Sequence, residues 1–375
     1  MENVSSACTH FCFDLFKKIN ENNSTGNLFF SPISISSALA MVFLGTKGKS
    51  AQQLSKTLHF NDVKDLHSTF QALNAEINKE NSMYALNLAN RLFGEKTFSF
   101  LPDFLSSIKK QYNADLGTVD FFSAAEDARK EINKWGSEQT KGKIPEVLPA
   151  GAVDCMTRLV LVNAIYFKGN WATQFNAKDT RDMPFQFNKK EQKVVKMMYQ
   201  KEKLPFNYIP EIKCRILELP YVGYEISMII ILPDNINDDT TGLQQLEKEL
   251  SLEKINKWTK NMMSAEVKIH LPKFTLKDSY KLKSQLAGMG MWDIFDAVSA
   301  DLTGMSASND LFLSEVIHKS FVEVNEEGTE AAVHTSAEIA QNCMTMEFNA
   351  DHPFLFLIRH NATKSILFFG RYSSP

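Results

Sequence analysis

Apolar residues follow two different spacings along this chain of 375 residues. The N-terminal half favours helices, and Ser31 is a predicted N-cap with Pro32 at the first position of a helix that continues to Ala40. From Arg158 onward, runs of β-branched and apolar residues predict strands at 158–166, 214–219, 226–232, 267–276, 314–324, 353–358 and 365–369. No linker, repeat or low-complexity tract interrupts the chain, so the pattern predicts one α+β domain over residues 1–375.

Residues 326–350 form a polar connection between two of the most strand-like stretches. A connection of roughly 25 residues far exceeds the usual length of about 4–6 and is typical of a functional or disordered segment. Its residues alternate in a strand-like way: Thr329, Ala331, Val333, Thr335, Ala337 and Ile339 would share one face, and Glu330, Ala332, His334, Ser336 and Glu338 the other. The alternation favours a latent strand that can enter a sheet. An Ala-rich surface helix remains open, because Glu326, Glu327 and Glu330 suit a first helical turn.

Several sequence motifs resemble those of the serpins. The segment Glu326–Ala332, EEGTEAA, is similar to the hinge of that family. Further matches in the same order are NLFFSPISIS from Asn27, LVNAIYFKGNW from Leu161, LPKF from Leu271, ADLTGM from Ala300, DHPFLF from Asp351 and FFGRYSSP from Phe368. The resemblance covers nearly the whole chain and points to the ovalbumin-like intracellular branch. It implies a serpin fold of three β-sheets with about nine helices and an exposed reactive-centre loop at 326–350.

This resemblance implies a protease inhibitor that acts as a suicide substrate. A protease cleaves the loop and forms an acyl-enzyme, and the loop then inserts into the large sheet and distorts the protease. The implied hinge comprises Glu326, Glu327, Gly328, Thr329, Glu330, Ala331 and Ala332. Thr329 begins the inward face, where a charged residue would be buried without a partner, so its presence favours an inhibitor. Val333 and His334 depart from the small residues usual there, which leaves a non-inhibitory, ovalbumin-like interaction or storage protein as the alternative.

The position of the reactive bond depends on how the loop is aligned. Matching Cys343-Met344 to the same dipeptide in an elastase-inhibiting relative predicts cleavage between these residues, and suits elastase-like or chymotrypsin-like proteases. Counting the usual loop length from Glu326 instead predicts cleavage between Asn342 and Cys343. That alternative fits an asparagine-preferring cysteine protease, so cross-class inhibition stays open.

Two further groups of residues take their expected roles from the resemblance. Ser31, Ser34, Asn163 and His318 resemble a polar cluster beneath the large sheet that controls its opening. Trp171, Lys273 and Glu326 resemble the group at the start of the loop, where Lys273 and Glu326 are expected to pair. Both groups also have an ordinary interpretation as satisfied polar residues of the core.

Composition and charge narrow the possible partners. A net charge of −3 gives no general attraction to nucleic acid. Lys189, Lys190, Lys193, Lys196, Lys201 and Lys203 form a local basic stretch that fits a solvated hairpin better than a heparin-like polysaccharide site, because acidic residues interrupt it. No run reaches the ~20 apolar residues needed to span a membrane. These observations exclude nucleic acid and membrane as expected partners. The resemblance implies a target protease as the partner, and we expect a monomer.

The chain shows neither a catalytic constellation nor a cofactor motif, so we expect no enzyme, cofactor or metal site. Cys8, Cys12, Cys155, Cys214 and Cys343 are odd in number and lack the spacing of a disulfide framework. The N-terminus lacks the features of a cleaved signal peptide. These observations predict a cytoplasmic protein, and the resemblance implies that it could be released without such a signal.

Overall fold

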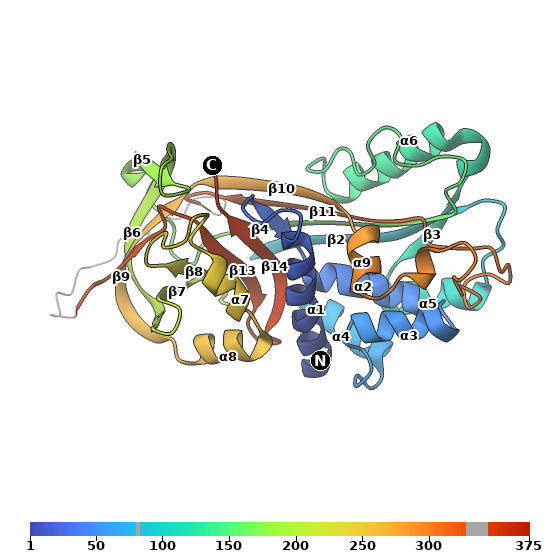
Figure 1. The fold of residues 1–375 in the computed structure, drawn as a ribbon, viewed down its shortest axis with the longest axis horizontal. Coiled ribbons are helices and arrows are strands. Elements are labelled where there is room, and N and C mark those ends of the chain that lie inside the picture. Colours follow the sequence, from blue (N-terminus) through green and yellow to red (C-terminus); the bar gives the residue numbers. More distant parts are fainter. Residues whose placement is uncertain (80–82, 328–343) are drawn as a thin grey trace.

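The computed structural model describes residues 1–79, 83–327 and 344–375 (Figure 1). Two β-sheets lie within this part of the chain, surrounded by α-helices. Nine α-helices occur among the described residues: α1 (Glu2–Asn20), α2 (Pro32–Phe43), α3 (Gly48–Thr57), α4 (Leu66–Ile77), α5 (Pro102–Tyr112), α6 (Phe121–Gln139), α7 (Gln244–Glu249), α8 (Leu252–Lys260) and α9 (Lys283–Met289). The helix predicted after Ser31 is α2, and the Ser31 side chain accepts a hydrogen bond from the Ser34 backbone as an N-cap.

A five-stranded sheet runs along the length of the molecule. Its spatial order is β10 (Phe274–Lys281), β11 (Glu315–Val324), β4 (Leu159–Gly169), β2 (Tyr84–Glu95) and β3 (Asp115–Val119). The central strands β11 and β4 are parallel, whereas β10–β11 and β2–β4 are antiparallel. Helix α6 covers one face through a separate apolar cluster that includes Phe121 and Ile132, and α2 packs toward the other face.

The second sheet has nine strands. Its order is β1 (Leu28–Phe30), β14 (Ser365–Tyr372), β13 (Phe354–His360), β8 (Ile226–Pro233), β7 (Cys214–Pro220), β6 (Gln192–Ile209), β9 (Met263–Pro272) and β12 (Met346–Asn349), with β5 (Arg181–Gln186) paired to β6. The predicted C-terminal hairpin is the antiparallel pair β13–β14. Three sheets were expected, but two occur in the described chain. The long strand β6 pairs with β5 and β9 along its length and with β7 at its end, and so joins what would be two sheets into one.

The strand predicted at 267–276 is in fact two strands. β9 pairs with β6 in the nine-stranded sheet, and β10 pairs with β11 in the five-stranded sheet. The chain crosses between the sheets at Lys273, whose backbone N–H donates to the Lys196 carbonyl at 2.8 Å. This crossing places Lys273 beside the end of β11, where the loop begins.

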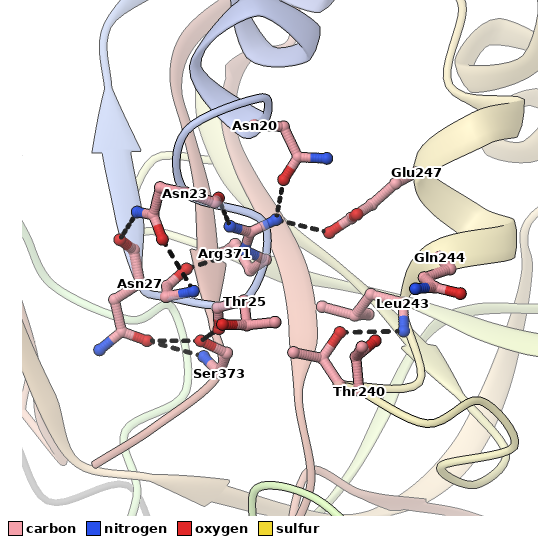
Figure 2. Close-up of polar contacts among 12 residues, drawn as sticks. Asn20, Asn23, Thr25, Asn27, Thr240, Leu243, Gln244, Glu247, Arg371 and Ser373 are labelled. Atoms are coloured by element: carbon pink, nitrogen blue, oxygen red, sulfur yellow. Dashed lines mark hydrogen bonds and ion pairs between the residues drawn. The ribbon is translucent and has the colours of Figure 1, made fainter.

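Arg371 fixes the last strand, β14, to the rest of the molecule (Figure 2). Its guanidinium is fully buried and donates hydrogen bonds to the Gly26 carbonyl at 2.8 Å and to Asn20 Oδ1 at 2.7 Å. It also pairs with Glu247 of α7 at 2.8 Å. Residues that follow the reactive loop in sequence are therefore bound to α1, α7 and the α1–β1 connection by non-covalent contacts alone.

Candidate functional site

Glu326 lies at the point where the chain leaves β11 to begin the loop. The residue is only 7% exposed. Its carboxylate pairs with Lys273 Nζ at 2.8 Å and accepts a hydrogen bond from Thr180 Oγ1 at 2.8 Å. Burial by itself raises the pKa of this carboxyl, but the bonds from Lys273, the backbone and Thr180 outweigh burial and hold the pKa below its ordinary value. The predicted ion pair is thus present, and it keeps a charged carboxylate at the start of the loop.

Trp171 joins the segment after β4 to the segment after β11. Its indole Nε1 donates to the Asn325 carbonyl at 2.9 Å. Close by, the Phe175 backbone N–H donates to the Glu326 carbonyl at 3.0 Å. The indole ring also stacks on Tyr221 with centroids 4.6 Å apart. Trp171, Lys273 and Glu326 therefore gather around residues 325–326, the arrangement that the resemblance implied.

The central strands of the five-stranded sheet part just below this group. The β11–β4 ladder runs from Glu315–Val160 to Phe321–Tyr166 and ends there. Both strands continue, however, and each stays paired to its outer neighbour: β11 to β10 as far as Val324, and β4 to β2 as far as Gly169. In the described chain, residues 322–324 and 167–169 thus have no ladder partner in the centre of the sheet. The two halves of the sheet separate at the end next to the loop.

The four predicted cluster residues meet beneath the middle of the same sheet. His318 on β11 contacts the Asn163 side-chain oxygen on β4 through Nδ1, and its Nε2 accepts from the Ser31 backbone N–H at 3.1 Å. The Asn163 amide nitrogen donates to the Ser34 hydroxyl. Ser31, Ser34, Asn163 and His318 are all buried. The cluster thereby ties both central strands to the start of α2.

These contacts fix the protonation state of His318. Nε2 must be unprotonated to accept from Ser31, and Nδ1 must carry the proton to donate to Asn163. Full burial lowers the pKa of His318 from 6.5 to about 3. The imidazole is therefore neutral across the physiological range, and a second proton would place two N–H donors against each other at Ser31.

Two residues in these groups were not found from the sequence. Asn90 on β2 accepts a hydrogen bond from the Asn163 amide, and Thr180 binds Glu326. Asn90 lies directly opposite Asn163 in the β2–β4 register, so only knowledge of that register could have identified it. Thr180 precedes β5 and has no local motif that relates it to a residue 146 positions later.

Part of the predicted loop lies outside the described residues. This applies to Gly328, Thr329, Glu330, Ala331 and Ala332 of the hinge and to Asn342 and Cys343 of the two alternative reactive bonds. Glu327 is described and exposed, and its backbone N–H donates to Asn325 Oδ1 at 3.1 Å. Met344, on the other side of the loop, is 84% exposed. The roles of all these residues stay predictions.

The basic stretch lies on the β5–β6 hairpin and its neighbourhood. Lys196 pairs with Asp182 at 2.6 Å, Lys201 with Glu266 at 3.0 Å and Lys189 with Asp239 at 3.2 Å. Acidic neighbours thus offset part of its positive charge, which agrees with a solvated hairpin. Within the described ranges, no group of His, Cys, Asp and Glu residues is arranged to hold a metal ion, and no helix there has the length and apolar character needed to cross a membrane.

Comparisons with known proteins agree with the resemblance seen in the motifs. Residues 6–375 match the family model described as "Serpin (serine protease inhibitor)". The chain is 82% identical to leukocyte elastase inhibitor of Xenopus laevis and 60% identical to that of Homo sapiens, each with 100% of both chains covered. The crystal structure of uncleaved ovalbumin matches with a TM-score of 0.91 and 38% identity, again over 100% of both chains. The predicted fold is confirmed by this likeness.

Proposed function

The chain belongs to the serpin family, and from this premise we propose that it inhibits a serine protease as a suicide substrate. The segment between β11 and β12 would be the bait that the protease cleaves. The expected loop of residues 326–350 is too long at its C-terminal end, because Met346–Asn349 pair with β9 as strand β12. After cleavage, the part that follows Glu326 would enter the five-stranded sheet between β11 and β4. The protease, still attached as an acyl-enzyme, would move with it and lose its active geometry.

The parting of β11 and β4 is the observation that carries this proposal. Main-chain groups of residues 322–324 and 167–169 bond alternately to the outer strands and toward the centre of the sheet, and those directed to the centre have no ladder partner in the described chain. This unpaired part of the sheet lies directly below the start of the loop. A chain that turns back after Glu326 would run antiparallel to β11 and, because β4 is parallel to β11, antiparallel to β4 as well. Insertion would replace one parallel pairing with two antiparallel ones. Residues 329–342 would span ~45 Å at about 3.3 Å per residue.

The chemical step belongs to the protease. Its nucleophile adds to the scissile carbonyl, the C–N bond breaks, and the new amine leaves with a proton from the protease's general acid. An ester then links the protease to the residue before the cut. Roughly ten new ladder bonds at ~0.5–1.5 kcal/mol each give on the order of 10 kcal/mol for insertion. Losing one oxyanion-hole donor costs a protease about 3–4 kcal/mol, so the energy of insertion suffices to disable deacylation.

The segment after the cut has to stay in place while the loop moves. β13 and β14 lie inside the nine-stranded sheet between β8 and β1, and Arg371 anchors them. The new end at residue 344 would thus remain at one end of the molecule while the acylated end travels along the sheet. This separation is what would prevent the two ends from rejoining.

Leukocyte elastase is the target we propose, because the relatives at 82% and 60% identity carry the name of its inhibitor. We propose Cys343-Met344 as the reactive bond, since a small apolar residue before the cut suits an elastase-like protease. Cleavage between Asn342 and Cys343 is the alternative. A non-inhibitory function is a second candidate, favoured by Val333 and His334 on the segment that would insert.

Mixing the purified chain with leukocyte elastase tests the proposal. We expect a band at the summed mass on denaturing gels, and a released C-terminal peptide whose mass identifies the bond. Elastase inactivated at its serine serves as the control and should give no such band. Complete loop cleavage without a covalent band, with this protease and with chymotrypsin, would reject inhibition and favour the second candidate.

A further inference from the structure

A groove of about 860 Å³ lies beside β12, the strand that follows the reactive loop. Its apolar lining comes from Phe206, Leu232 and Ile236, together with the ring of Tyr208. Thr345, Met346 and Glu347 line it as well. The groove therefore begins only a few residues after the proposed cut, and it is part of the same end of the molecule.

The groove borders an edge strand. β12 ends the nine-stranded sheet and pairs with β9 alone among the described strands. Arg215 of β7 reaches this strand, where its Nη1 donates to the Glu347 carbonyl. An unpaired strand edge next to an open groove is a common site for main-chain recognition by a partner.

The side chains that form one wall are held in a fixed arrangement. Asp234 accepts a hydrogen bond from the Tyr208 hydroxyl at 2.7 Å and pairs with Arg215 Nε at 3.3 Å. Arg215 in turn reaches β12, so the wall and the edge strand are connected. A surface whose side chains are already positioned loses less entropy on binding.

The charge of the groove is negative. Arg215 and Asp234 balance each other, which leaves the carboxylates of Glu347 and Asp351. Glu347 is exposed and forms no ion pair with a described lysine or arginine, and Asp351 contacts only His352 among the described basic side chains, at 2.8 Å. A partner loop that carries Lys or Arg beside an apolar residue matches this combination of charge and lining.

We infer that this groove is a second docking surface for the target protease. While the reactive bond occupies the active site of the protease, the groove receives a cationic, partly apolar surface loop of the same protease. The inference rests on the proposed function. Met344 is exposed and leads straight into Thr345 and Met346 of the groove, so a protease seated on the bond before Met344 must cover this surface. Contacts made here would speed the encounter and select among proteases that accept the same cleavage sequence.

Charge reversal tests the inference. We would measure the second-order rate constant for loop cleavage by leukocyte elastase, which reports the encounter whether or not a covalent complex follows. At low ionic strength, Glu347→Lys and Asp351→Lys should each lower this rate constant about fourfold. Each substitution changes the charge of the groove by two units, and we take the cation of the protease to lie about 10 Å away in water. The loss should shrink toward unity at high salt. Asp62→Lys, in the connection between α3 and α4 far from β9, is the matched control and should leave the rate unchanged (Figure 1).

The outcomes separate this inference from the proposed function. If the wild-type chain forms the covalent complex but the double variant Glu347→Lys, Asp351→Lys reacts within twofold of it at low salt, the docking surface is refuted and inhibition stands. If the wild-type chain is cleaved without trapping the protease while the variants are cleaved more slowly, inhibition is refuted and the docking surface stands. A circular dichroism spectrum equal to wild type establishes that the variants are folded.

Discussion

Acidification should destabilise the chain through His318, and replacing this residue with Gln should remove that part of the pH dependence. The folded chain keeps the imidazole neutral because Nε2 accepts from Ser31, and its pKa is about 3, compared with 6.5 for the exposed group. Above pH 6.5 neither state binds the proton. Between pH 6.5 and 3 the unfolded chain binds it and the folded chain does not, so acid favours unfolding.

The size of the effect follows from the two pKa values. Lowering the pH from 7.5 to 4.5 costs about 1.36 kcal/mol for each of the two units below 6.5, or ~2.7 kcal/mol. With an unfolding entropy of about 2.1 cal/mol/K per residue, this corresponds to a fall in Tm of about 3–4 °C for a chain of this length. In His318→Gln, the amide can still accept from Ser31 but does not titrate, so that share of the fall should vanish.

Scanning fluorimetry at pH 7.5 and 4.5, at one heating rate, measures the difference between the two chains. We expect the wild-type Tm to fall by about 3–4 °C more than that of His318→Gln. Other acidic and histidine groups contribute equally to both chains and cancel. Equal falls in the two chains, or an imidazole NMR signal of His318 that titrates near pH 6.5, would contradict the hydrogen-bonding arrangement described for the cluster.

Three further predictions concern the loop and its anchors. Lys273→Met should lower the free energy of unfolding by about 1–3 kcal/mol, because Glu326 stays buried without its cation. In urea unfolding, the double variant Lys273→Met, Glu326→Gln should recover part of this loss, and no recovery would show that the two residues are not coupled. Arg371→Met should lower the free energy of unfolding by about 3–5 kcal/mol, because Glu247 is left buried without its partner. Adding Glu247→Gln should restore stability, and a double variant that is no more stable than Arg371→Met would contradict the anchoring role of the ion pair. Thr329→Arg should convert the inhibitor into a substrate, because the expected inward face cannot bury the charge. Glu330→Arg, on the expected outward face, is the control and should still trap the protease on denaturing gels. Full trapping by Thr329→Arg would exclude insertion.

The sequence predicted those features whose signal is local. Ser31 capped its helix because a Ser before Pro32 is a strong N-terminal pattern, and the hairpin of β13 and β14 followed from two apolar runs around a turn. The pairing of Lys273 with Glu326 was expected from motif resemblance and is present at 2.8 Å.

Features that depend on tertiary pairing were missed. β9 and β10 were read as one strand because both are β-rich and only Lys273 separates them, although they belong to different sheets. Asn90 belongs to the cluster because it lies opposite Asn163 in the β2–β4 register, which the sequence does not reveal. Two sheets were found where three were expected, because β6 is long enough to pair with both β9 and β7. The parting of β11 and β4 could not be predicted from the sequence, because it depends on where the ladder between two strands about 150 residues apart ends. Residues 322–324 have an ordinary strand composition, and Gly169 indicates only the end of β4.

Hydrogen exchange at the opening between β11 and β4 tests the central claim most directly. Amides in peptides that cover 322–324 and 167–169 would be followed by mass spectrometry in the intact chain and in the chain whose loop has been cleaved. Insertion of the loop predicts that the amides directed toward the centre of the sheet become strongly protected after cleavage, because a new strand would pair with them. The remaining amides already belong to the ladders with β10 and β2 and should change little. Exchange that is as fast after cleavage as before would mean that the loop does not enter the sheet, and would contradict the proposed mechanism.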